Sequence, residues 1–176
     1  MAMRLVNLLL GPVVLAVLAG CSMRVTSDYD RSADFSRLET YSWATPDQPA
    51  TGDPALDDSL LHSRVRRAVE RELSVKGYRV VASGEPDFLV THHVTRETKF
   101  APTFASPGWQ SGLRTELDQY REGTLILDLL DPNDMRLLWR GTAITSIDES
   151  AAPKDREATV NKAVRLILER FPPKPK

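Results

Sequence analysis

The 176-residue chain carries 23 Lys and Arg against 24 Asp and Glu, so its formal net charge at pH 7 is −1. This balance argues against a nucleic-acid partner, because nucleic-acid-binding domains are usually basic. The one cysteine, Cys21, rules out a disulfide within the chain and a metal site built on several cysteines. Packing therefore has to supply the stability of the fold.

Residues 1–20 have the features of a secretory signal. Arg4 supplies positive charge, and residues 5–18 form an apolar run of about fourteen residues. That run is shorter than the roughly 17–25 residues that span a membrane as a helix. It ends in LAGC (residues 18–21), which is typical of a bacterial lipobox, where a diacylglyceryl group alkylates the cysteine thiol and cleavage exposes the cysteine.

A lipobox predicts that Cys21 is the lipidation site and that the protein binds the membrane through it. Two alternatives, an ordinary signal with a chance cysteine and a buried core cysteine, account less well for the position of the only thiol. Ser22 stands where lipoproteins retained in the inner membrane typically carry aspartate. The sequence therefore predicts anchoring in the inner leaflet of the outer membrane, with the domain facing the periplasm.

Removal of the signal peptide leaves 176 − 20 = 156 residues, the size of one domain with a core. We expect residues 21–24 to form the lipidated N-terminus and a short tether, and residues 25–176 to form a single periplasm-facing α+β domain. Strand-like sequence begins four residues after Cys21, so the tether reaches about 13–14 Å. The edge of the sheet should then lie against the membrane, and the region opposite the tether should face partners.

Two helices are predicted by apolar residues at helical spacing. The first has Asp57 or the Asp53-Pro54 pair as its cap and ends at Gly77. The second ends before Pro172, because proline cannot continue a helix. Its apolar stripe consists of Val160, Ala163, Val164, Ile167, Leu168 and Phe171.

Alternating patterns predict strands over residues 25–30, 39–44, 78–82, 87–94, 123–130 and 136–144. The turn residues DPND at 131–134 join the last two strands into a hairpin. The resulting order, ββαββββα, has too few helices for a parallel βαβ array. The sequence therefore predicts an α+β fold with a mostly antiparallel β-sheet and two helices packed on one face.

Alternation also assigns side chains of the last hairpin to the two faces of the sheet. The face turned away from the helices should be the more polar one, because it carries Thr124, Asp128, Arg140 and Thr142. The residues expected beneath the helices are Leu125, Leu127, Leu129 and, if the turn register allows, Leu137, Trp139 and Ala143.

Three segments carry a family resemblance: SDYDRSADFSRLETYSW (27–43), YREGTLILDLLDPNDMRLLWRGTA (120–143) and AVRLILERFPPKP (163–175). They resemble the bacterial lipoproteins grouped as domain of unknown function 4136. The resemblance covers nearly all of the mature chain and implies a periplasm-facing α+β lipoprotein. It implies no reaction, so no catalytic residue is carried over from it.

The histidines do not have the spacing of a metal site. His92 and His93 are neighbours in a predicted strand, so their side chains point to opposite faces and cannot chelate one ion. His62 belongs to a predicted helix, without an H-x-x-x-H pattern. We interpret His92 as a hydrogen-bonded residue at the edge of the core and His93 as a surface residue. No metal and no cofactor is predicted.

Other polar groups have structural explanations. Asp131, Asn133 and Asp134 suit a turn and lack the spacing of a calcium loop. Neither a nucleophile elbow nor a glycine-rich phosphate loop is present, which favours a protein that is not an enzyme. The basic run 64–71 either contacts anionic lipid head groups or forms a solvated helix face; Arg66 beside Glu70 favours the second.

Residues 100–120 combine aromatics, prolines and glycines without periodicity, which is typical of a long loop. Phe104 and Trp109 are its candidate partner-binding residues. If they are exposed, they suit a protein or glycan partner in the envelope. If they pack against the sheet, they are a lid on the core, and both interpretations remain open.

These observations favour an outer-membrane-anchored lipoprotein that acts as a non-catalytic binding or structural component of the cell envelope. One alternative is a hydrolase-type enzyme with a pocket under the 100–120 loop, which a buried polar cluster around His92 would favour. Another is a lipid carrier, which would need an apolar cavity between sheet and helices.

Overall fold

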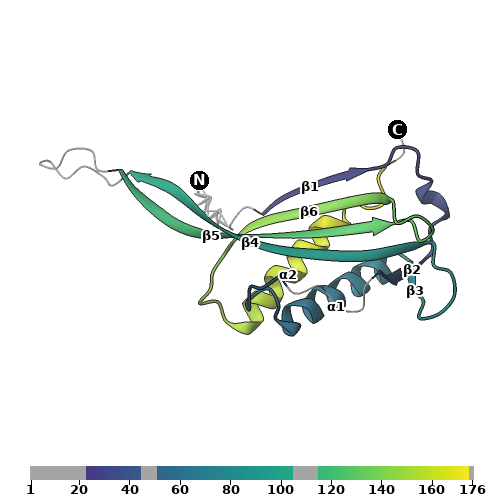
Figure 1. Ribbon diagram of the computed structural model, residues 1–176, viewed down its shortest axis with the longest axis horizontal. Coiled ribbons are helices and arrows are strands. Elements are labelled where there is room, and N and C mark those ends of the chain that lie inside the picture. Colours follow the sequence, from purple (N-terminus) through teal and green to yellow (C-terminus); the bar gives the residue numbers. More distant parts are fainter. Residues whose placement is uncertain (1–22, 45–50, 105–114, 175–176) are drawn as a thin grey trace, which may run out of the picture.

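The computed structural model describes residues 23–44, 51–104 and 115–174, with the backbone alone at 103–104 and 115–117 (Figure 1). Within these ranges the chain forms a six-stranded sheet and two α-helices. The elements are β1 (Arg24–Tyr29), η1 (Phe35–Arg37, a 3-10 turn), β2 (Thr40–Trp43), α1 (Ser59–Val75), β3 (Arg79–Val80), β4 (Phe88–Phe104), β5 (Thr115–Leu130), β6 (Leu137–Ile147) and α2 (Pro153–Leu168).

The strand order across the sheet is β1-β6-β5-β4-β2-β3. The first four strands in this order pair with one another in antiparallel fashion, whereas β2 is parallel to both β4 and β3. The predicted α+β class and the order ββαββββα are confirmed. The sheet is mixed rather than antiparallel throughout, because α1 carries the chain back before β3 starts and so makes a single βαβ unit.

The predicted start of α1 was wrong by one residue. Asp58, not Asp57 or Asp53, is the cap, and its carboxylate accepts a hydrogen bond of 2.9 Å from the backbone N–H of Leu60. Asp57 instead accepts hydrogen bonds from Thr51 at 2.7 Å and from the backbone N–H of Gly52 at 3.0 Å, which fixes the preceding loop. Several carboxylates within one turn compete for the cap, and spacing alone does not select among them.

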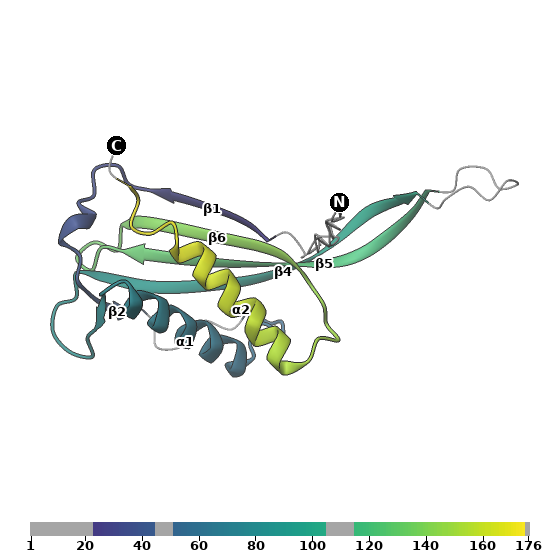
Figure 2. The same cartoon turned by 180° about the vertical axis from the view of Figure 1, so that it is seen from behind.

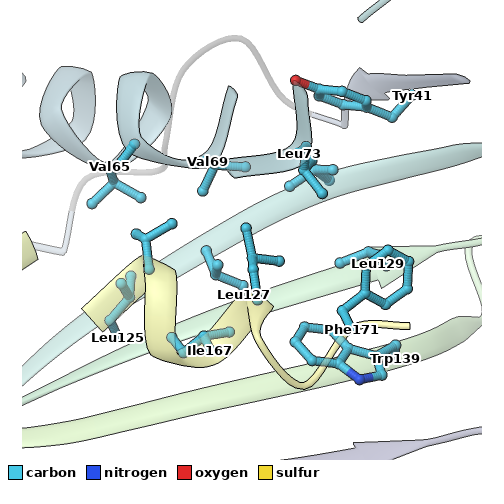
Figure 3. Packing of buried hydrophobic residues seen from close by; sticks show 14 of the residues in the cluster. Tyr41, Val65, Val69, Leu73, Leu125, Leu127, Leu129, Trp139, Ile167 and Phe171 are labelled. Atoms are coloured by element: carbon cyan, nitrogen blue, oxygen red, sulfur yellow. The ribbon is translucent and has the colours of Figure 1, made fainter. Parts of the chain in front are cut away.

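Both helices lie on the same face of the sheet (Figures 1 and 2). The core fills the space between the helices and the sheet (Figure 3). Leu125, Leu127 and Leu129 of β5 point into it, as predicted. Trp139 is fully buried, and its ring centroid lies 5.3 Å from that of Phe171, which follows α2. The other buried members include Tyr41, Val65, Val69, Leu73, Phe88, Val90, Ala143, Val164, Ile167 and Leu168.

Leu137 was predicted to join the core, but in the structure it does not. The register is shifted where β5 meets β6, so that Leu129 pairs with Trp139 and Leu130 pairs with Leu137. Leu138 is therefore an extra residue on β6, and it is buried, whereas Leu137 is 36% exposed. A β-bulge of this kind interrupts strict alternation, which is why the pattern misplaced Leu137.

The central strands β4 and β5 are longer than predicted, with 17 and 16 residues. The stretch 100–120, interpreted from the sequence as a loop, is strand over residues 100–104 and 115–120. Its prolines and glycines obscured the alternation. Among the described residues, β2 pairs with β4 only as far as Val90, so Pro102 lies where β4 has β5 as its one paired strand, and proline in sheets is confined to such edges.

The outer thirds of these strands form a projection. The last residue of β6, Ile147, pairs with Arg121 of β5. Beyond that pair, in the part of the chain that the structure describes, residues 99–104 and 115–120 pair only with each other. These residues are called the β4–β5 arm. Figures 1 and 2 show the arm extending beyond the end of the sheet, away from both helices.

Candidate functional site

The β4–β5 arm has two different faces. Residues directly opposite each other in an antiparallel pair share a face. One face carries Phe100 opposite Gln119, and the other carries Lys99 opposite Tyr120. Phe100 is 63% exposed and Tyr120 is 40% exposed. The arm thus presents aromatic surface to solvent from a two-stranded backbone.

The structure places the candidate partner-binding residues only in part. Phe104 is the last residue of β4, and its backbone pairs with Thr115. Trp109 and the lipidation site Cys21 lie outside the described residues. The described part of the 100–120 stretch continues the sheet away from the core, so this part is no lid.

An ion-pair network holds the root of the arm. Arg96 of β4 donates to both carboxylate oxygens of Asp53, at 3.0 and 2.7 Å, and to Glu149 at 2.8 Å. Arg121 of β5 lies 3.1 Å from the same Glu149 oxygen. Since the Arg96 side chain is only 20% exposed, this network is less screened by water than a surface pair. It joins the loop before α1, both arm strands and the loop after β6.

A hollow of about 580 Å³ lies beside this root. Its carboxylates already have partners: Asp148 accepts hydrogen bonds from the Ser150 hydroxyl at 2.6 Å and from its backbone N–H at 2.8 Å. These bonds hold the pKa of Asp148 below its usual range, so Asp148 is a poor general acid near neutral pH. The lining residues are Gln119, Tyr120, Arg121, Ile147, Asp148, Glu149 and Ser150.

A second group of polar side chains lies between α1 and the sheet. His62 Nδ1 is 3.1 Å from His92 Nε2, and the ring of Trp43 meets that of His92 edge-on at 5.8 Å. Burial, reinforced by electrostatic interaction with the nearby His62, lowers the pKa of His92 from 6.5 to about 4. His92 is therefore neutral under ordinary conditions. Exposed His93 points away from this group, as predicted.

The same region is tied to α1 by Glu70. Its Oε1 atom accepts hydrogen bonds from Trp43 Nε1 at 3.1 Å and from Arg66 Nε at 3.0 Å. The Arg66 guanidinium also lies 5.0 Å from the centre of the Trp43 ring. The predicted Arg66–Glu70 pair is confirmed. These contacts dock the helix on the sheet, and they leave Glu70 engaged rather than free to act as a base.

Sequence reasoning did not find the His62–His92 contact, because the two residues are 30 positions apart and meet only when α1 packs on β4. In the described ranges, no three His, Cys, Asp or Glu side chains gather as a metal site would require. The hairpin carboxylates serve the turn, as predicted: Asp131 accepts a hydrogen bond from the backbone N–H of Asn133 at 2.8 Å.

The sheet with two helices on one face defines an α+β domain. Residues 25–173 match the family model described as Domain of unknown function (DUF4136), and the chain belongs to that family. No curated protein matches the sequence.

Two solved structures are similar to this chain. The first is the crystal structure of a PDZ domain protein from Parabacteroides distasonis, with 18% identity and a TM-score of 0.56 over 89% of this chain and 36% of that one. The chain thus spans about a third of the length of that protein, and the likeness shows the fold alone. The second is a PelC dodecamer from Paraburkholderia phytofirmans, with 8% identity and a TM-score of 0.47 over 84% of this chain and 95% of that one.

Among the described residues, neither helix is both long and apolar enough to cross a membrane.

Proposed function

We propose that this protein is a lipid-anchored, non-catalytic component of the bacterial cell envelope, and that the β4–β5 arm is its contact element. The lipobox at residues 18–21 and Ser22 support an anchor in the inner leaflet of the outer membrane. The family resemblance of the segments named above supports a lipoprotein that faces the periplasm.

The observation that carries the binding role is the arm itself. A two-stranded ribbon on its own is only marginally stable in water, yet this one extends past every neighbouring strand that the structure describes. It exposes Phe100 at its side, and large aromatic side chains are enriched where proteins make contacts. An ion-pair network around Arg96 keeps its root in a fixed direction.

The enzyme alternative has one observation in its favour, the polar group around His92. Both histidines of that group are engaged with each other. The hollow at the arm root is lined by other residues. A substrate seated in that hollow would therefore not meet the His62–His92 pair, which disfavours catalysis there. The lipid-carrier alternative is disfavoured because Val69, Leu127 and Ile167 fill the space between helices and sheet, each with 0% exposure.

Metabolic labelling with a fatty-acid analogue tests the anchor. The wild-type protein should acquire the label and fractionate with the outer membrane. Cys21→Ala should stay unlabelled and unprocessed, because the thiol is the acceptor. Wild-type protein that never acquires the label would end the proposal of a lipid anchor.

Photo-crosslinking in cells tests the contact role of the arm. A photoreactive residue at Phe100 should form adducts with envelope components. The matched control is Met135, which is similarly exposed at 53% but lies in the β5–β6 turn, at the opposite end of the sheet. Equal adduct formation from both sites would remove the arm from the proposal.

A further inference from the structure

The chain enters the sheet at the same end from which the arm leaves. Arg24, the first residue of β1, pairs with Ile144, which pairs with Thr124, which pairs with Thr95. These four residues form one row across four strands. From this row β1 runs away from the arm, as Figures 1 and 2 show. Met23, which precedes Arg24, therefore lies at the same end of the sheet as the arm.

From the row, β4 reaches further than the tether does. β4 continues nine residues beyond Thr95, to Phe104, which is about 30 Å at about 3.3 Å per residue. Cys21 is three residues before Arg24, a reach of about 10–11 Å even when fully extended. An anchor at Cys21 thus holds the row within about 10–11 Å of the membrane, whereas β4 reaches about three times as far from the row, to the end of the arm. The arm cannot point at the membrane without meeting it.

The arm also has the side chains for such a meeting. Phe100 and Pro102, two residues apart on β4, lie on one face of the arm. Lys99, Asp118 and Tyr120 lie on the other face. A ribbon with one face free of charged side chains, which carries Phe100, Pro102 and Gln119, and one charged face suits the boundary between lipid and water.

The backbone edges of the arm limit how deep it can lie in the membrane. In the described ranges, β2 does not extend past Trp43 and β6 does not extend past Ile147, so the arm has no flanking strand. Backbone N–H and C=O groups without partners are too costly in the hydrocarbon layer. The arm therefore fits the head-group region, where water and phosphate can satisfy these groups, and not a position across the bilayer.

We propose that the β4–β5 arm lies along the phospholipid surface of the membrane that holds the lipid anchor, with Phe100 and Pro102 turned toward the lipid. This inference rests on the proposed anchor at Cys21. It differs from the expectation that Phe104 and Trp109 of the 100–120 stretch contact a protein or glycan partner, because it assigns the arm to the lipid surface.

Site-specific fluorescence of the full mature protein tests the inference. The protein is purified from membranes and placed in vesicles of phosphatidylethanolamine and phosphatidylcholine. An environment-sensitive dye is attached to Phe100→Cys or to one of two controls at the far end of the domain, Val75→Cys and Met135→Cys, where the native residues are 80% and 53% exposed. Lipidation consumes the thiol of Cys21, the only native cysteine, so each variant takes one dye.

Nitroxide-bearing lipid should quench the dye at position 100 several-fold more than at positions 75 and 135, and aqueous iodide should show the reverse order. High salt should leave both results unchanged, because the contact is apolar. In a second variant, Phe100→Asp with the dye at Tyr120→Cys, lipid quenching should fall below that of Tyr120→Cys alone. This change is on an exposed side chain and leaves the core intact.

Iodide quenching of position 100 equal to that of both controls would overturn the inference. So would lipid shielding that occurs only after a second protein is added, since that result assigns the arm to a protein partner. Mass spectrometry of the same preparation separates the two proposals. A mass without lipid defeats the anchor and the arm placement together, whereas a lipidated mass with an aqueous arm defeats the arm placement alone.

Discussion

Asp128 and Arg140 face each other across β5 and β6 and are joined by two hydrogen bonds, 2.7 Å from Nε to Oδ1 and 2.6 Å from Nη2 to Oδ2. The partners differ in exposure, because the Asp128 side chain is 5% exposed and that of Arg140 is 47% exposed. The pair lies on the face of the sheet opposite the helices, the face predicted to be polar.

This asymmetry predicts unequal effects of removing each partner. Arg140→Ala leaves a buried carboxylate without its donor and should lower the free energy of unfolding by about 1–3 kcal/mol. Asp128→Ala leaves a guanidinium that water can reach, so its loss should be smaller, about 0–1 kcal/mol. Urea denaturation of both variants checks the order. A larger loss for Asp128→Ala would mean that the carboxylate is important for another reason.

Trp139 supplies a prediction about the core. Its ring is fully buried against Phe171, so Trp139→Ala should cost about 3–5 kcal/mol, as large aromatic truncations do. Its indole Nε1 lacks a hydrogen-bond partner among the described residues. Trp139→Phe should therefore cost clearly less, because it keeps much of the ring and removes the unpaired donor. Denaturation midpoints of the two variants give the comparison; equal losses would contradict it.

Gly141 leaves room for that ring. A Cβ atom at position 141 would lie 2.4 Å from both Ile167 Cγ2 and Trp139 Cη2. Gly141→Ala should thus destabilise the fold by about 1–3 kcal/mol through overpacking. Gly123→Ala is the control, because its Cβ would meet the end of the partly exposed Ile147 side chain, which can move aside. In thermal unfolding, the midpoint temperature of Gly141→Ala should be well below that of Gly123→Ala.

His92 predicts how stability changes with pH. Its pKa is lowered from 6.5 to about 4, mainly by burial. The unfolded chain therefore binds a proton near pH 6.5 that the folded protein refuses until about pH 4. The free energy of unfolding has its full value above this window and falls as the pH is lowered through it.

His92→Gln should flatten that dependence, measured as the urea midpoint at several pH values. His93→Gln, on the exposed neighbour, keeps His92 and should retain the wild-type slope. A slope that survives in His92→Gln would place the linked proton elsewhere.

Alternation and helical spacing predicted most of the fold. Leu125, Leu127 and Leu129 point to the helices because a regular strand has a strict period of two. The prediction failed for Leu137, because the bulge beside it inserts one residue and no local sequence pattern indicates that bulge. The parallel pairing of β2 was also not predicted, because it depends on how α1 packs and not on any short motif.

The candidate site was less accessible to sequence reasoning. The 100–120 stretch was singled out correctly as unusual, but as a loop, since Pro102 and the neighbouring aromatics conceal a strand. The His62–His92 contact depends on two elements whose packing no spacing encodes. Only the row that joins Arg24 to Thr95 relates the arm to the tether, and that row exists only once four strands have paired.

The pairing of β1 with β6 has a consequence for export. Among the described strands, β6 is the only neighbour of β1, and it comes from residues 137–147. A chain that crosses the inner membrane N-terminus first keeps β1 without its partner until nearly the whole domain has followed. During that delay β1 is not yet held in the sheet. For the proposed lipoprotein, the long sequence separation of its first and last strands lets acylation and cleavage precede the closure of the sheet.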